Sequence, residues 1–277
     1  MAEITFNKYG SYYIREGWFE KAINAIKLAN TNIFHKDDTV YYLGISQGMC
    51  QSLKYWLRAA KVIDSSTNML TEFGELLYQY DKYLESPFSW FLIHYHLSAN
   101  RKDCPIIYEV FNSNVKIFTK ESILNRLQTS FSNDNICVDS KVLVSDLNLF
   151  LTSYSKSEME YSPEDNYYCP LSRLKLITKE GETYKRTQPA FSKLSHMVVY
   201  YALLNCYGGK QFELDDSLIC NNSPVKIFNL DTNAYLEYLQ ELKREKIINI
   251  DRAVGLNFVC FNKTISLEEI FSNNDGF

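Results

Sequence analysis

The sequence lacks the close ligand pairs that structural metal sites need. Its seven cysteines are scattered, no CxxC occurs, and no histidine-rich segment accompanies them. Zinc sites draw their ligands from closely spaced Cys and His residues, so we expect no zinc site. The N-terminus also lacks a basic-then-apolar leader. Dispersed cysteines without a leader predict a cytoplasmic protein with reduced, mostly buried thiols.

Long apolar runs and an overall positive charge are also missing. No stretch approaches the roughly 20 apolar residues of a membrane-spanning helix, so we expect no membrane among the partners. The 29 Lys and Arg residues stand against 33 Asp and Glu, which gives a net charge of −4. A negative chain does not attract nucleic acid through its overall field. Any nucleic-acid binding therefore has to come from local patches.

The common catalytic motifs form the third absence. The sequence contains no GxSxG, no P-loop, no GxGxxG and no HExxH. A DNA hydrolase normally needs clustered carboxylates to hold a divalent ion. Adjacent acids do occur, but they are more typical of surfaces and helix starts than of metal sites. These pairs are Asp37–Asp38, Glu164–Asp165 and Asp215–Asp216.

What the chain does contain is an ordinary globular composition. Its 277 residues are 46% hydrophobic and 15% aromatic, enough for one large or two modest domains with real cores. Helical periodicity dominates, with short strand-like runs, so we predict a mainly α fold with small β-wings (α+β) built from tandem winged-helix or helix-turn-helix-like units. The predicted domains are 1–154 and 169–277, joined by a polar linker at 155–168.

One helix has a face that suits a DNA groove. Over residues 46–63 the apolar side chains share one side, at i, i+3, i+4 and i+7: Leu53, Trp56, Leu57 and Ala60. Long polar and basic side chains, with no acid among them, share the other: Gln47, Gln51, Lys54, Arg58 and Lys61. A short helix and Gly44 precede this segment, as in a helix-turn-helix. The alternative is an ordinary helix with a solvated face.

A second basic run lies between Leu171 and Lys193. It includes Lys185 and Arg186, which we count among the predicted DNA-binding residues, although solvated loop charge explains such a run equally well.

His94 and His96 lie two apart on a predicted helix, so they do not share a face and are expected to pack rather than to chelate. Asp146 lies in an apolar helix, so it faces outward or has a partner, for which Arg15 is a candidate.

Several phrases along the chain resemble, in order, a bacterial family of proteins of unknown function, DUF4007. They include REGWFEKAI, the stretch DDTVYYLGISQGMCQSLKYWLRAAKVI, YLESPFSWFLIHYHLSAN, SDLNLFLTSY and EDNYYCPLSRLKLI. Members are encoded beside cysteine desulfurases and PAPS-reductase-like proteins in clusters for DNA phosphorothioation and antiphage defence. The resemblance implies a protein that binds double-stranded DNA and nicks one strand with Mg²⁺ or Mn²⁺. Its partners would be these sulfur-transfer proteins, and a homodimer is a further expectation.

The resemblance also nominates residues. Arg15, Gly17 and Trp18 match the family's Arg-x-Gly-Trp motif, and Asp146 and Asp165 match recurrent acidic positions, which makes these two the candidates for metal or water handling. A His-Glu pair that often precedes the motif is replaced by Tyr9-Gly10. The chemistry of this member is therefore open, and two non-catalytic alternatives stand beside nicking. One is a DNA-binding adaptor that recruits sulfur-transfer enzymes; the other is a transcriptional regulator of the gene cluster.

Overall fold

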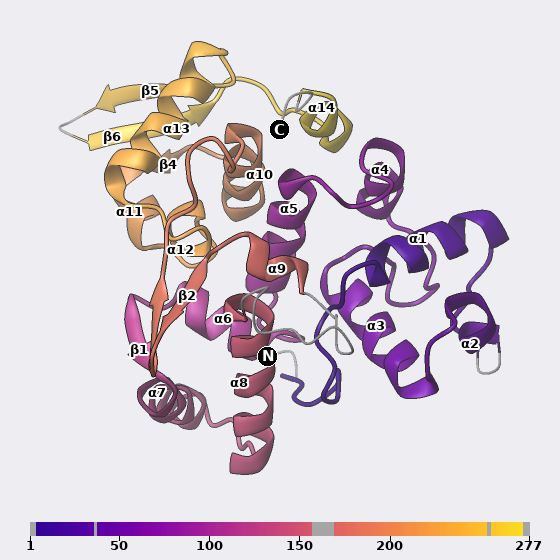
Figure 1. The fold of residues 1–277 in the computed structure, drawn as a ribbon. Coiled ribbons are helices and arrows are strands. Elements are labelled where there is room, and N and C mark those ends of the chain that lie inside the picture. The colour runs from indigo at the N-terminus through magenta and orange to yellow at the C-terminus, as the bar shows by residue number, and fades with distance from the viewer. Residues whose placement is uncertain (1–3, 36–37, 157–168, 254–255, 274–277) are drawn as a thin grey trace.

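The structure is a computed structural model, and it describes residues 4–35, 38–156, 169–253 and 256–273. Helices dominate it, and two small antiparallel sheets lie among them (Figure 1). The elements before residue 157 are α1 (Trp18–Ala29), α2 (Asp38–Leu43), α3 (Gln47–Ala59), α4 (Glu72–Tyr80), α5 (Pro87–Ser98), α6 (Pro105–Asn112), β1 (Ile117–Thr119), α7 (Lys120–Asn133) and α8 (Ser140–Ser155). Those after residue 168 are α9 (Pro170–Arg173), β2 (Ile177–Glu180), β3 (Thr183–Arg186), α10 (His196–Tyr207), β4 (Phe212–Glu213), α11 (Leu214–Ile219), α12 (Pro224–Ile227), α13 (Thr232–Arg244), β5 (Ile248–Ala253), β6 (Leu256–Phe261) and α14 (Leu267–Ser272). The predicted mainly α, α+β class is confirmed.

The core is organised around α5, which lies near the middle of the molecule (Figure 1). Every residue of α5 from Phe88 to Ser98 is buried. A helix that is apolar on all sides belongs in a core rather than at a surface. Helices α6, α9 and α10 pack against it. Because these helices come from both sides of residues 157–168, the two predicted domains share one core.

The two histidines of α5 are packing residues, as expected. His94 lies between the Tyr154 hydroxyl, 2.8 Å from its Nδ1, and the Ile227 carbonyl oxygen, 3.0 Å from its Nε2. A carbonyl oxygen only accepts, so Nε2 carries the proton and Nδ1 accepts from Tyr154. Burial lowers the pKa of His94 to about 3, and it lowers the pKa of His96 to about 3 as well. Both rings are therefore neutral at physiological pH.

Capping side chains set several helix starts. Thr71 accepts the backbone N–H of Gly74 at the start of α4, Thr119 accepts that of Ser122 at α7, and Asp231 accepts that of Ala234 at α13. Helix α10 ends at Gly208, which has a φ of +60°. It begins at His196, where the Ser195 side chain accepts the backbone N–H of Met197.

The first sheet has the order β1-β3-β2 and was not predicted. Part of the basic run between Leu171 and Lys193, for which the sequence left DNA contact and solvated loop charge open, forms a β2–β3 hairpin around Gly181. Strand β1 pairs antiparallel with β3, with Ile117 opposite Lys185. Because β1 precedes residues 155–168 and β3 follows them, this sheet joins the two predicted domains. The predicted linker itself falls almost wholly on residues 157–168, outside the described residues.

The second sheet has the order β4-β6-β5. Helix α13 leads into the paired strands β5 and β6, and β4 pairs with the other side of β6.

All seven cysteines are free thiols, as expected. Only Cys50, Cys104 and Cys169 are buried, so the prediction of mostly buried thiols was wrong for the other four. None of the helices in the described part of the chain combines the length and apolar character that crossing a membrane requires.

Candidate nucleic-acid interface

Helix α3 begins after the predicted tight turn. Gly44 has a φ of +61°, a conformation that glycine adopts without strain, and it directly follows α2. The Ser46 side chain then accepts the backbone N–H of Met49 and caps α3. Leu53, Trp56 and Leu57 are buried, so the apolar face lies where its spacing places it. The opposite face of the helix is directed away from the core.

The N-terminal segment holds α3 in place from beneath. The Tyr9 ring stacks on the Trp56 indole with centroids 4.4 Å apart. The Trp56 Nε1–H donates to the Tyr12 carbonyl oxygen at 2.9 Å, and the Ser52 hydroxyl donates to that of Tyr9 at 2.8 Å. Both aromatic rings are buried, so α3 is anchored by packing as well as by hydrogen bonds.

The outward face of α3 is only partly free. Gln47 and Gln51 are exposed, whereas Lys54 is half-buried with its ammonium 5.8 Å from the centre of the Phe34 ring. Burial, and next the charge of Arg58, lower the pKa of Lys54. The Arg58 guanidinium donates twice to Asn68 Oδ1, from Nε at 3.0 Å and from Nη2 at 2.6 Å. This face therefore presents two amides, one ammonium and a partly engaged guanidinium.

Lys61 does not belong to this face. Helix α3 ends at Ala59, and Lys61 follows with a φ of +57°, outside helical geometry. The prediction that extended the helical periodicity to Lys61 was wrong, because the helix ends two residues before Lys61. Lys61 is exposed beside the loop that Asn68 ties back to Arg58.

The Arg15–Gly17–Trp18 motif lies where α1 begins against α3. Gly17 has a φ of +75° and precedes the buried Trp18, so a side chain at residue 17 would be strained. The Arg15 guanidinium lies 5.3 Å from the Trp18 ring centre and 5.6 Å from that of Tyr12. Its Nη1 is 4.0 Å from the sulfur of Met49, on α3. The motif thus positions α1 relative to α3.

Asp146 is buried, with an exposed fraction of 1%. Its Oδ2 accepts the backbone N–H of Asn7 at 2.9 Å, and Oδ1 has no hydrogen-bond partner among the described residues. Burial raises the pKa of Asp146 to about 6, and the hydrogen bond from Asn7 partly offsets that rise. The expected partner is thus a backbone amide rather than Arg15. Through Asn7, this carboxyl holds the segment that carries Tyr9 under α3.

The other nominated acid, Asp165, lies outside the described residues. Within the described ranges, no three His, Cys, Asp or Glu side chains come close enough together to hold a metal ion. Magnesium takes oxygen ligands in octahedral geometry, and buried Asp146 alone does not provide them. The described residues therefore do not fit a Mg²⁺ or Mn²⁺ centre.

Lys185 and Arg186 lie side by side on β3 and behave oppositely. Lys185 is exposed, whereas Arg186 is buried and all five of its N–H donors are used. Its acceptors are Asn229 Oδ1 and the carbonyl oxygens of Val110, Phe111, Ser113 and Lys226. The prediction of a DNA contact from the Arg186 side chain is corrected: it has no donor left for a phosphate oxygen.

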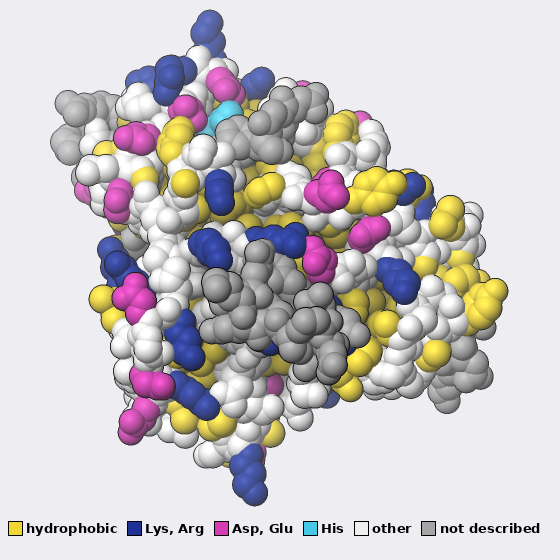
Figure 2. Space-filling model, viewed as in Figure 1, with side chains coloured by type: hydrophobic (Ala, Val, Ile, Leu, Met, Phe, Trp, Pro, Cys, Tyr) yellow, Lys and Arg dark blue, Asp and Glu magenta, His cyan; other side chains and the backbone are white. Residues whose placement is uncertain are grey.

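The predicted DNA-binding residues therefore fall into two places. Four of them share α3, while Lys185 lies on the β1-β3-β2 sheet, across the molecule from α3 (Figure 1). Figure 2 shows Lys and Arg interspersed with Asp and Glu over most of the visible face, and gathered around its middle near α9 and the β2–β3 hairpin. Local patches rather than an overall field are thus the source of positive potential.

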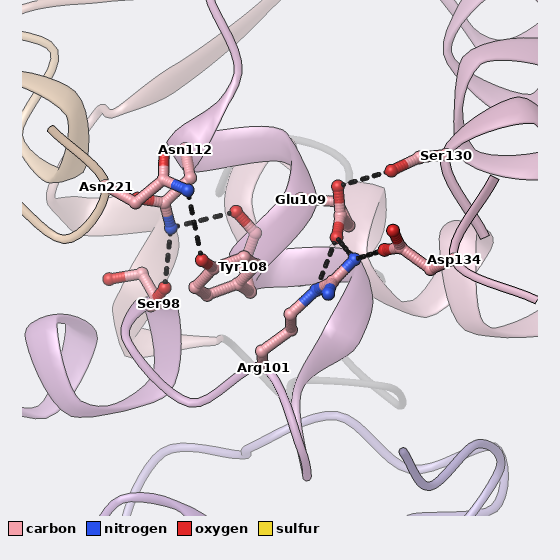
Figure 3. A network of polar contacts seen from close by, with 8 residues as sticks. All are labelled: Ser98, Arg101, Tyr108, Glu109, Asn112, Ser130, Asp134 and Asn221. Carbon is pink, nitrogen blue, oxygen red and sulfur yellow. Dashed lines mark hydrogen bonds and ion pairs between the residues drawn. The ribbon is translucent and has the colours of Figure 1, made fainter. Parts of the chain in front are cut away.

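A polar pocket of about 260 Å³ was not foreseen from the sequence. It lies beside α6 and α7, and its walls include Arg101, Tyr108, Glu109 and Arg126. Arg101 forms ion pairs with both Glu109 and Asp134, and Ser130 donates to Glu109 Oε2 at 3.0 Å (Figure 3). These side chains come from separate helices and loops, so no local sequence pattern marks them.

The amino-acid sequence assigns the chain to a known family. The model of the family described as "Protein of unknown function (DUF4007)" matches residues 6–273, so the chain belongs to that family. No curated protein matches the sequence. Two solved structures of a protein named SspB, one of them magnesium ion-bound, share its fold. The magnesium-bound structure matches with a TM-score of 0.80 and the other with 0.78, each at 21% sequence identity and covering 94% of this chain and 84% of SspB.

Proposed function

We propose that this protein binds double-stranded DNA as a component of a bacterial DNA phosphorothioate modification system. The observation that carries the proposal is the fold shared with SspB over 94% of the chain. The outward face of α3 supports the DNA-binding part, because it presents Gln47, Gln51 and Lys54 on a helix that follows a short helix and a tight turn. In this proposal α2 with α3 is the unit that contacts DNA, and α13 with β5 and β6 is a separate winged-helix-like unit that serves in packing.

The finer proposal is that the protein nicks one DNA strand with Mg²⁺ or Mn²⁺. It is supported by the magnesium ion in one of the SspB structures. A second candidate function, a non-catalytic adaptor that brings cysteine desulfurase and PAPS-reductase-like proteins to DNA, is favoured by Asp146. That carboxyl is buried against the Asn7 amide, a position that suits support of the fold better than contact with a scissile phosphate.

DNA binding is tested with Gln51→Glu combined with Lys54→Glu. The chain offers a matched control on α13, where Gln240 and Lys243 have the same spacing and are exposed. We expect the α3 double variant to bind a fluorescent duplex at least tenfold more weakly at 0.15 M salt, because it removes a positive charge and adds two negative ones at the groove. Gln240→Glu with Lys243→Glu should bind as the parent does. Equal affinity of both double variants would contradict the role of α3.

Nicking is tested separately, on supercoiled plasmid with and without Mg²⁺ or Mn²⁺. Conversion to open circles that requires the metal and the intact protein supports the nickase. Retained duplex binding without open circles at any metal concentration excludes it, and then capture of the sulfur-transfer proteins on DNA-loaded beads supports the adaptor. A regulator would instead protect one palindromic site in a footprint.

A further inference from the structure

A groove of about 680 Å³ runs between the β1-β3 edge and the start of α13. It is distinct from the α3 face and from the polar pocket of Figure 3, although Ser113 borders both hollows. Its charged lining residues are Lys116, Lys185, Arg186, Lys226 and Asp231. Four cations thus face one carboxylate in a chain whose net charge is −4.

The one carboxylate is already in use. Asp231 Oδ1 accepts the backbone N–H of Ala234 at 2.8 Å and caps α13. Lys185 and Lys116 are exposed at the rim, and the Lys226 ammonium donates to Asn221 Oδ1 at 3.1 Å, a neutral partner. The described ion pairs include none of these three lysines.

The wall of the groove adds a buried positive charge. Arg186 makes its five hydrogen bonds to neutral oxygens, four of them backbone carbonyls and one a side-chain amide, and none to a carboxylate. Arg101 in the neighbouring pocket shows the contrast, because Glu109 and Asp134 neutralise it. A buried charge is screened less than an exposed one, so Arg186 raises the potential over the groove without touching a ligand.

The remaining lining indicates what kind of anion fits. Asn114, Thr187 and Thr232 offer neutral hydrogen-bonding groups, and Leu218, Val225 and Leu230 form an apolar part. Among the described residues that line the groove none is aromatic, so the stacking platform that unpaired bases use is missing. Lysines with neutral polar neighbours are what phosphate oxygens of a duplex contact.

We propose that this groove binds the phosphodiester backbone of DNA, as a second contact separate from α3. The inference rests on the proposed DNA-binding function and extends it to a surface on the other side of the fold. Lys116, Lys185 and Lys226 make the phosphate contacts, and Arg186 strengthens them through its field. These contacts carry no base specificity, and they fix how the duplex lies on the protein.

The first test is the salt dependence of duplex binding for Lys116→Glu with Lys185→Glu. Each phosphate contact contributes about 0.9 to the slope of log K against log salt concentration. We expect the double variant to lower the slope by about 2 and the affinity at 0.15 M salt about tenfold or more. The matched control is Lys210→Glu with Lys243→Glu, two exposed lysines outside the groove, which should keep the parent slope.

The second test uses the unaltered protein. Lysine acylation followed by mass spectrometry, with and without duplex, should show protection of Lys116, Lys185 and Lys226 but not of Lys210 or Lys243. If the protein binds duplex and the α3 variants weaken it, yet the groove variant keeps the slope and its lysines stay reactive, this inference is wrong while the proposed function stands. If the parent binds no duplex, the proposed function fails first. Protection by poly-glutamate but not by duplex would assign the groove to an acidic protein segment and overturn the inference.

Discussion

The α3 face and the groove beside β3 each contain an arginine, and the two arginines are used in opposite ways. Arg58 lies at the protein surface and shares one acceptor, Asn68 Oδ1, between two of its nitrogens. Arg186 is buried, and each of its five N–H groups donates to an oxygen atom of the protein itself. Arg58 can exchange one of these hydrogen bonds for a bond to a ligand. Arg186 can only stabilise the fold and contribute its positive charge to the local potential.

This difference shows two ways to make a positive surface on a negative protein. On α3 the basic groups themselves are displayed, and the packing of Tyr9 on Trp56 beneath them fixes their position. At the groove a structural cation lies behind the lysines, and no carboxylate cancels it. Substitution of each arginine, and of the Asp146 carboxyl that holds the segment beneath α3, tests this difference.

The largest effect is expected for Arg186→Met. The change leaves the carbonyl oxygens of Val110, Phe111, Ser113 and Lys226 without this donor, and unpaired buried acceptors are unfavourable. We expect the free energy of unfolding to fall by about 3–5 kcal/mol, measured by urea denaturation. Lys185→Met, one residue away but exposed, should change it by no more than about 0.5 kcal/mol. Similar losses for both variants would show that the hydrogen bonds of Arg186 do not stabilise the fold.

The next effect concerns the segment that supports α3. The pKa of Asp146 in the folded protein is raised to about 6 from an ordinary 3.8, so the folded state binds the proton more tightly than the unfolded state. This contribution to stability is complete below about pH 3.8 and is lost as the pH rises through 6, with a total of about 3 kcal/mol. Asp146→Asn stays neutral and should escape this loss.

Urea denaturation of the parent and of Asp146→Asn at pH 4 and pH 7 measures the difference. The stability of the parent relative to the variant should decline between these two pH values. Profiles that remain parallel would mean that the carboxyl is not destabilised by its burial. Under the nickase proposal, this substitution separates catalysis from stability, because a loss of nicking in a well-folded variant cannot be attributed to unfolding.

The smallest effect is expected for Arg58→Ala. It removes two hydrogen bonds to Asn68, a buried residue at a φ of +59° in the loop after α3. We expect a loss of about 1–2 kcal/mol in the free energy of unfolding, well below that of Arg186→Met. The affinity of the variant for duplex DNA, measured at a temperature where the variant is folded, then shows how much the Arg58 guanidinium contributes to DNA binding. A loss as large as that of Arg186→Met would contradict the contrast between the two arginines.

Local signals carried most of what the sequence predicted. The apolar face of α3 follows from the spacing of Leu53, Trp56 and Leu57, and the turn before the helix follows from Gly44. Such features need no knowledge of the rest of the fold. The same reasoning failed at Lys61, because periodicity does not report where a helix gives way to a left-handed residue.

The remainder depended on contacts between distant segments. The burial of Arg186 requires carbonyl groups near residues 110–113 and at residue 226, which no pattern around β3 announces. The three-residue strand β1 is too short to give a period-two signal, so its pairing with β3 was invisible. Asp146 illustrates a middle case: its odd position in an apolar helix was visible, but its partner, the Asn7 amide, was not.

The link between Arg186 and the carbonyl groups of Val110, Phe111 and Ser113 also bears on synthesis of the protein. When the ribosome has produced the first 150 residues, strand β3 and Arg186, which pair with β1 and with these carbonyl groups, have not yet been synthesised. The N-terminal portion therefore stays incomplete until β3 has left the exit tunnel. A gene split between α8 and α9 should accordingly yield two chains that are poorly soluble alone and recover the fold when expressed together.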